Sequence, residues 1–185
     1  MARLQTTIDS CRDTCSEDNA LNSISASATS KLVQLLTAPA GLNAAISAMA
    51  QETAISLQPV AARQFFTNNV SSDIAEKSEE VKYTAVYIYC EKIANTLTEK
   101  FRSFSGHLQM VVEVRVSQDR LDGVEQSAQL YTESVTQTLN QLRGDWGQGL
   151  FYAGTYDVAF GAVKHGGKNF IKTVKVTFPV EATVS

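Results

Sequence analysis

The sequence predicts an α+β fold: a mostly antiparallel sheet with a long cover helix on one face, plus an N-terminal helical region. The first observation is an alternation of apolar and polar side chains over residues 108–117. The second is a change to spacings of three and four over residues 119–143, as in an amphipathic helix. The third is a pair of alternating stretches, 156–160 and 174–180, around the glycine-rich stretch 161–169, which predicts a β-hairpin.

The alternating stretch 108–117 is expected to form a half-buried strand, because side chains of a strand point to opposite faces in turn. One face would carry Leu108, Met110, Val112, Val114 and Val116, and the other Gln109, Glu113, Arg115 and Ser117.

The helix that follows is expected to begin after Asp119, whose side chain can cap the first turn, and to end at Arg143 before Gly144. A helix of about 24 residues is roughly 36 Å long and can lie across several strands. The apolar stripe would consist of Val124, Ala128, Tyr131, Val135, Leu139 and Leu142.

The N-terminal region is predicted to be separate from the sheet domain, with residues 1–59 as a polar arm and short helices and residues 60–185 as the core domain. Residues 1–30 are small and polar, so we expect this arm to need a partner to become ordered. A short helix is predicted over residues 31–36, before Pro39, and a second, alanine-rich helix over residues 41–53.

The middle of the chain is predicted to be extended over residues 60–70, with one helical turn at 71–77. Residues 83–90 are apolar at successive positions, so this strand is expected to be covered on both faces. Its tyrosine face suits either the core or a surface buried by another copy. Residues 91–106 suit a helix about as well as an irregular extension, and we interpret them as a strand continuation followed by a long loop.

Composition narrows the class of protein. The chain has 185 residues, 44% of them apolar, and a net charge of −3, which gives no argument for nucleic-acid binding. No apolar run approaches the roughly 20 residues that cross a bilayer, and the N-terminus does not resemble a secretory signal. Three cysteines, widely placed, argue against a disulfide framework. We therefore expect a soluble protein made in a reducing cytoplasm.

The residue types of an active site are sparse, so no enzyme, no cofactor and no metal site are predicted. Only His107 and His165 are available as imidazoles, and Cys90 in a strand is more simply a small core residue than a nucleophile. Cys11 and Cys15 are four residues apart, but no second pair of ligands accompanies them as a zinc site would need.

The glycines do not form a phosphate-binding loop. Gly144, Gly147 and Gly149 follow a helix instead of joining a strand to a helix N-terminus. Gly166 and Gly167 lie in the predicted hairpin, where glycine provides a positive φ.

Three groups of residues are candidates for an interaction surface: Tyr87 and Tyr89, the loop residues Phe101, Arg102 and Phe104, and the hairpin residues Lys164, His165 and Lys168. For the loop, a protein interface is favoured over nucleic acid, because Glu91 and Glu99 offset its basic charge. For the lysine-rich hairpin, protection of an edge strand and a docking role remain equally open.

Three segments resemble small structural proteins of tailed bacteriophages: Tyr83 to Lys92, Phe101 to Gly106 and the strand Val112 to Ser117. The C-terminal part, from Gly144 through Lys164 to Phe178, does so too. The order of strand, long loop, strand, long helix and hairpin is similar to that of the tail terminator, or tail completion, family of the phage neck.

This resemblance implies a virion protein that forms a ring, usually of six copies, without catalysis or cofactor. Such a ring caps the tail tube and joins it to the head–tail connector, and DNA passes through its lumen without specific binding. Its partners would be copies of itself, the tail tube protein and connector or neck proteins. The resemblance implies no binding to a membrane. A head–tail adaptor, a tube or baseplate component, or a small-molecule binding module are the alternatives.

Overall fold

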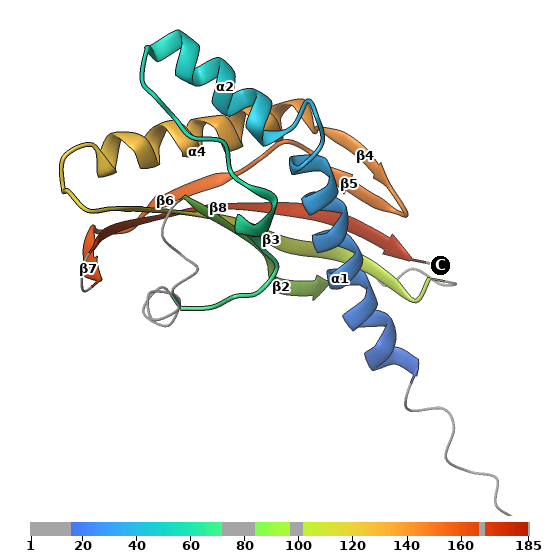
Figure 1. Cartoon of the computed structure of the whole chain (residues 1–185). Coiled ribbons are helices and arrows are strands. Elements are labelled where there is room, and N and C mark those ends of the chain that lie inside the picture. The colour runs from blue at the N-terminus through green and yellow to red at the C-terminus, as the bar shows by residue number, and fades with distance from the viewer. Residues whose placement is uncertain (1–15, 72–83, 97–101, 167–168, 185) are drawn as a thin grey trace, which may run out of the picture.

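The computed structural model describes residues 16–71, 84–96, 102–166 and 169–184. Figure 1 shows a long, strongly twisted sheet with helices packed on one side of it. The helices are α1 (Ser16–Leu36), α2 (Leu42–Thr53), the short 3-10 helix η1 (Ala62–Gln64) and α4 (Val124–Gln141). The strands are β1 (Phe65–Phe66), β2 (Ala85–Asn95), β3 (Phe104–Gln118), β4 (Gly144–Gly147), β5 (Leu150–Tyr152), β6 (Asp157–Phe160), β7 (Lys164–Gly166) and β8 (Asn169–Val184). The predicted α+β class is confirmed.

The sheet has the strand order β1-β2-β3-β8-β5-β4, and β6 and β7 also pair with β8. Every pairing is antiparallel except the short parallel contact of β1 with β2. The two longest strands, β3 and β8, pair along their whole length, from Phe104 opposite Val184 to Gln118 opposite Phe170. They form the centre of the sheet on which the other elements are arranged.

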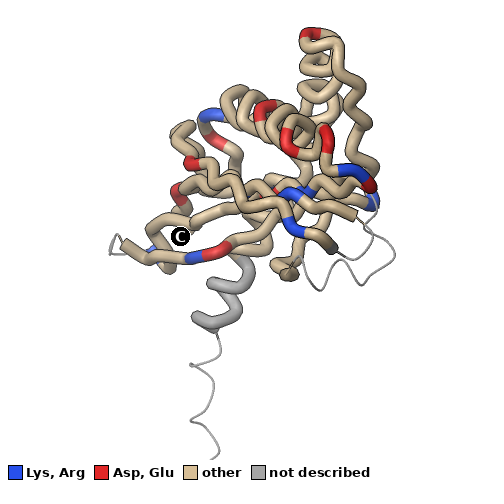
Figure 2. Tube along the Cα trace, turned by 90° about the vertical axis from the view of Figure 1, so that its left-hand side faces the viewer, with Lys and Arg blue, Asp and Glu red and all other residues tan. Residues whose placement is uncertain are grey.

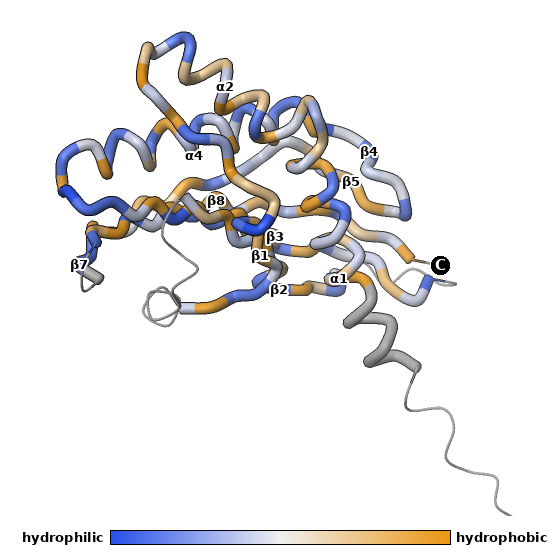
Figure 3. Tube along the Cα trace, in the orientation of Figure 1, coloured by the Kyte–Doolittle hydropathy of each residue, from blue (hydrophilic) through white to orange (hydrophobic). Residues whose placement is uncertain are grey.

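The main hydrophobic core lies between this sheet and the helices. The predicted apolar face of β3, from Leu108 to Val116, is buried in it, together with Val174, Val176 and Phe178 of β8. Figure 3 shows the alternation of hydrophobic and hydrophilic residues along the strands. Side chains of α1, α2 and α4 join the same cluster. In the described residues, the boundary expected between residues 59 and 60 therefore does not separate two cores.

Helix α4 has the predicted apolar stripe but not the predicted start. Val124, Ala128, Tyr131, Val135 and Leu139 are buried. The helix has 18 residues instead of about 24, and its N-cap is Gly123 in the left-handed region (φ 83°). The prediction that Asp119 caps the helix is wrong, because the chain makes a turn before the first helical residue. The ion pair between Lys172 and Glu125 connects β8 to the first turn of α4.

Helix α1 is longer than predicted: it begins at Ser16, whereas the sequence indicated helix only from Lys31 to Leu36. Ile24, Ala28, Leu32 and Leu36 are buried, and their spacing of four places them on one stripe. The predicted helix over residues 41–53 is confirmed as α2, which buries Leu42, Ile46 and Met49.

The segment that follows α2 is hydrogen-bonded to α4 through the side chain of Tyr131. The Tyr131 hydroxyl donates to the carbonyl oxygen of Gln58 at 2.8 Å and accepts from its backbone N–H at 3.0 Å. Beyond it, the extended stretch predicted at 60–70 contains η1 and the two-residue strand β1.

Strand β2 continues beyond Cys90 to Asn95, with a register irregularity between Cys90 and Lys92. The strand continuation predicted after residue 90 is therefore confirmed, whereas most of the predicted loop lies outside the described residues, and β3 already begins at Phe104. The prediction for residues 72–77 lies outside the described residues.

The glycine-dense stretch after α4 is a second β-hairpin, β4–β5, which the sequence indicated only as a turn. Gly147 and Gly149 have φ values of +81° and +75°, which favour glycine. Gly149 is also close to β8, because a Cβ there would overlap the carbonyl oxygen of Thr183. The predicted C-terminal hairpin is confirmed, with β6 and β7 pairing along β8.

Candidate functional site

The sheet face opposite the helices carries a cluster of tyrosine and charged side chains. This outer-face cluster consists of Tyr87 and Tyr89 of β2, Glu113 and Arg115 of β3, and Lys175 of β8. The strand register positions it, because Tyr87 lies opposite Glu113 and Glu113 lies opposite Lys175. The carboxylate and the guanidinium are both buried, which is unusual for charged groups unless they are paired.

Glu113 is the centre of the hydrogen bonds in the cluster. Its Oε1 accepts from Arg115 Nε at 2.6 Å, and its Oε2 accepts from the Tyr89 hydroxyl at 3.1 Å. Lys175 Nζ lies 3.6 Å from the same Oε2. One negative and two positive charges are thus brought together, so the cluster has a net positive charge.

Arg115 is covered by the protein on several sides. Its guanidinium carbon lies 3.9 Å from the centroid of the Tyr87 ring, a cation–π contact, and that ring stacks on Phe66 at 4.8 Å. One Nη2 proton is donated to the carbonyl oxygen of Val70. In the described residues, Nη1 is buried and has no hydrogen-bond partner.

The surroundings keep the tyrosines protonated and the lysine charged. Burial raises the pKa of Tyr87, which outweighs the opposing effect of Arg115, and burial and the charge of Glu113 raise the pKa of Tyr89. Burial lowers the pKa of Lys175, but its hydrogen bond with Tyr89 and the charges of Glu113 and Glu91 outweigh this, so the pKa is raised. At neutral pH the cluster therefore offers a positive head group beside neutral phenols.

A cavity of about 280 Å³ adjoins the cluster. Glu113, Arg115, Thr173 and Lys175 provide its floor from β3 and β8. Its sides come from the chain between β1 and residue 71 and from the stretch between β6 and β7, through Asn69, Val70, Ser71, Gly161, Ala162 and Lys164.

The structure separates the predicted interface residues into three groups. Tyr87 and Tyr89 are buried, so of the two alternatives for the tyrosine face, the core of the chain itself is favoured. Phe104 is also buried, in the main core. Arg102, Lys164 and His165 are exposed, whereas Phe101 and Lys168 lie outside the described residues.

Of the hairpin lysines that the structure describes, Lys164 and Lys175 line one cavity, but Lys172 is separate from them. Lys172 is buried and paired with Glu125 on the helix side, and Lys175 belongs to the outer-face cluster. In the view of Figure 2, residues of both signs are spread over the helices and strands.

The two histidines lie far apart. His107 is opposite Glu181 and His165 is opposite Phe170 on the same strand, which is eleven residues or roughly 36 Å along β8. Burial raises the pKa of the Cys90 thiol, whose proton is directed to the carbonyl oxygen of Lys92 at 3.4 Å, so the protonated thiol is favoured. Cys11 and Cys15 lie outside the described residues. Among the described residues, no group of three or more His, Cys, Asp and Glu side chains is placed to hold a metal ion.

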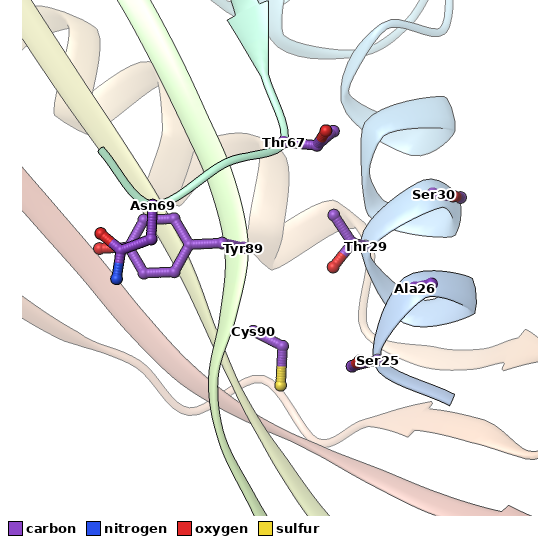
Figure 4. A pocket seen from close by; sticks show the side chains of 8 residues that line it. All are labelled: Ser25, Ala26, Thr29, Ser30, Thr67, Asn69, Tyr89 and Cys90. Carbon is purple, nitrogen blue, oxygen red and sulfur yellow. The ribbon is translucent and has the colours of Figure 1, made fainter. Parts of the chain in front are cut away.

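A second, more open hollow lies between α1 and β2 (Figure 4). Its volume is about 410 Å³, and its lining is mostly small and polar, with Ser25, Ala26, Thr29 and Ser30 on the helix side. Figure 4 shows the Cys90 side chain directed toward α1, whereas the Tyr89 ring points to the other side of β2, toward Asn69. The hollow thus lies at the outer edge of β2.

The sequence analysis missed Glu113, Arg115 and Lys175 as members of one site. A signal was present, since two opposite charges two residues apart on one face of a central strand have to be covered or paired. The predicted strand was expected to expose that face, and only the register with Tyr87 and Lys175 shows that the charges are enclosed.

None of the described helices is long and apolar enough to cross a membrane. Comparisons of the chain with protein-family models, with curated proteins and with solved structures found no match.

Proposed function

We propose that the chain is a structural subunit that assembles with copies of itself into a closed ring, as a tail terminator does at the neck of a tailed phage. The observation that carries the proposal is the position of large apolar side chains on the two opposite edges of the sheet. Ile93 on β2 is 37% exposed, and Phe160 on β6 is 52% exposed at the other edge.

The backbone of these edges is also available for pairing. Beyond Tyr87, β2 pairs only with β3 among the described strands, and β6 pairs only with β8. Unpaired N–H and C=O groups on an edge strand are a template for another chain. Because the strands run in the order β2, β3, β8 and β6, the two available edges lie on opposite sides of the subunit.

A contact between two different edges is heterologous, and repetition of such a contact gives a ring when the rotation closes. The position of the ring at a phage neck depends on the resemblance in the order of strand, loop, strand, long helix and hairpin. The net charge of −3 is compatible with a lumen through which DNA slides, because a strongly basic lining would hold phosphates.

The test is the assembly state of the purified full chain, by light scattering after size exclusion and by negative-stain imaging. We expect small closed rings for the wild type, and a large loss of rings for Phe160→Asp and for Ile93→Asp, because each places a charge in an apolar contact. Leu121→Asp is the matched control, since Leu121 is 57% exposed in the turn before α4. If Phe160→Asp and Ile93→Asp assemble like the Leu121→Asp control, the edges are not the interface.

Imaging also separates the other structural roles. Stacked tubes in place of single rings would favour a tail tube protein, and open or asymmetric assemblies would favour an adaptor. A cavity of about 460 Å³ beside Tyr131 and Ser117 is the observation that favours the small-molecule alternative. A monodisperse monomer that a metabolite stabilises would support that alternative and contradict the ring.

A further inference from the structure

We propose that the cavity beside Arg115 and Lys175 binds a small oxyanion, of the phosphate or carboxylate class. The floor of this site lies on the outer face of the central strands β3 and β8, and Arg115 and Lys175, which would contact the anion, are not residues of the proposed ring edges. Its presence does not depend on the ring.

The first argument is the unfilled donor capacity of Arg115. The residue is 4% exposed and lines the cavity. Its Nε is bonded to Glu113 and its Nη2 to Val70, but within the part of the chain that the structure describes, Nη1 has no acceptor. A buried donor without an acceptor is costly, and guanidinium groups recognise the oxygens of phosphates and carboxylates. Nη1 is itself buried, so an oxyanion in the cavity would reach it after a small movement of the Arg115 side chain, and no protein acceptor of Nη1 would have to be displaced.

The second argument is charge. Among the described residues that line the cavity, Glu113 is the one acidic residue, and its two oxygens already accept from Arg115 and Tyr89. Lys175 lines the same cavity, and its side chain is 42% exposed, so its head group remains accessible to a ligand. The described lining thus has three positive residues, Arg115, Lys164 and Lys175, against Glu113, and it remains positive when Glu91, which also acts on Lys175, is counted.

The third argument is size. A volume of about 280 Å³ holds several waters but is smaller than the usual range for drug-sized ligands. Gly161, Ala162 and Ser71 on the walls have small side chains, so the space is not filled by the protein itself. A free phosphate or a short carboxylate fits this space.

The experiment titrates inorganic phosphate into the full chain and measures binding by calorimetry and by the rise in melting temperature, with sodium chloride at matched ionic strength as the reference. Sodium acetate provides the carboxylate arm of the same titration. We expect saturable binding of one anion per chain, with the stronger of the two arms identifying the class. Lys175→Met should weaken it about tenfold, because one charge-assisted hydrogen bond is lost. Arg120→Met removes a positive charge from an exposed turn and should leave binding unchanged.

A second pair of variants keeps the test valid if Lys175→Met does not fold. Ala162 is exposed on the wall of the cavity, so Ala162→Glu adds a carboxylate there without disturbing the core. Ala162→Glu should abolish phosphate binding, and Ala162→Gln, of the same size, should retain more of it. The proposal is overturned if phosphate and acetate act no differently from chloride on the wild type. It is equally overturned if Lys175→Met binds like Arg120→Met, or if the Glu and Gln variants of Ala162 bind alike. The readout is binding per chain, so it is independent of whether rings form.

Discussion

The guanidinium of Arg115 lies over the ring of Tyr87, 3.9 Å from its centroid, on the sheet face that the helices do not cover. Phe66 stacks on the same ring at 4.8 Å. This arrangement encloses a charged side chain on the outer face of β3 with groups of the same chain. It explains how β3 is buried on both faces while only one of them is apolar.

Removal of one member of the buried pair of Glu113 and Arg115 should strongly destabilise the protein. Glu113→Gln leaves the buried guanidinium without its counter-charge, and we expect a loss of about 3–5 kcal/mol in the free energy of unfolding. Urea denaturation measures this loss. Glu181→Gln, on an exposed position of β8, should change it little. Equal effects of the two substitutions would mean that Arg115 does not depend on Glu113.

The β4–β5 hairpin gives a test of close backbone approach. Gly149→Ala should destabilise the protein much more than Gly147→Ala, although both residues have positive φ values. Gly147 has open space around it, so its substitution costs about 1–2 kcal/mol of backbone strain alone. At Gly149 the added Cβ would also displace β8 at Thr183, whose N–H donates to the Gly149 carbonyl oxygen at 2.9 Å. The melting temperatures of the two variants measure this difference in stability, and equal values would contradict the close approach of Gly149 to β8.

The elements that the sequence predicted well are those with a strong period. The apolar stripe of α4 and the alternation in β3 and β8 follow directly from side-chain spacing. The start of α4 was not predictable from capping preference, because the N-cap is Gly123, which has no side chain, and neither Asp119 nor Asp122 takes that position. The length of helix α1 was underestimated because part of it is a run of Ser, Ala and Thr, in which the small side chain of Ala28 is the one that packs in the core. Ile24, Leu32 and Leu36 lie at the same spacing of four residues.

The connection between α2 and η1 should depend on the Tyr131 hydroxyl. Tyr131→Phe removes two hydrogen bonds to the backbone of Gln58, and we expect a loss of about 1–3 kcal/mol in the free energy of unfolding. Hydrogen exchange should become faster at Gln58 and its neighbours, whereas amides in the centre of β3 should be protected as before. Unchanged exchange at Gln58 would show that Tyr131 does not hold this segment.

Ionisation of the Tyr152 phenol should lower the stability of the protein at alkaline pH. Burial raises the pKa of its phenol to about 12, although the charge of Arg143 opposes the shift. The unfolded chain loses this proton near pH 10 and the folded chain only near pH 12, so ionisation favours unfolding. The contribution of the Tyr152 phenol to the free energy of unfolding is therefore complete below about pH 10 and is lost as the pH rises toward about 12.

The comparison with Tyr152→Phe isolates this effect, because the pKa values of Tyr87 and Tyr89 are raised as well. In the described residues the Tyr152 hydroxyl has no hydrogen-bond partner, so the substitution removes no bond. The free energy of unfolding, measured from pH 9 to 11.5, should fall less steeply in the variant. Parallel pH profiles for the wild type and the variant would refute the assignment.

The outer-face cluster shows where prediction from the sequence ends. Tyr87 and Tyr89 were noted as one face of a strand, and Glu113 and Arg115 as one face of the next strand. Their contact depends on a register that places Tyr87 opposite Glu113 and Glu113 opposite Lys175. Register between strands far apart in the chain is set by packing of the whole sheet, which a single sequence does not display.

The native mass of the purified chain tests the central claim most directly. With a subunit of 20.1 kDa, we predict one closed species whose mass is a whole multiple of that value, with six copies as the expectation from the resemblance. A lone 20.1 kDa subunit at every concentration up to the solubility limit would contradict the proposed ring.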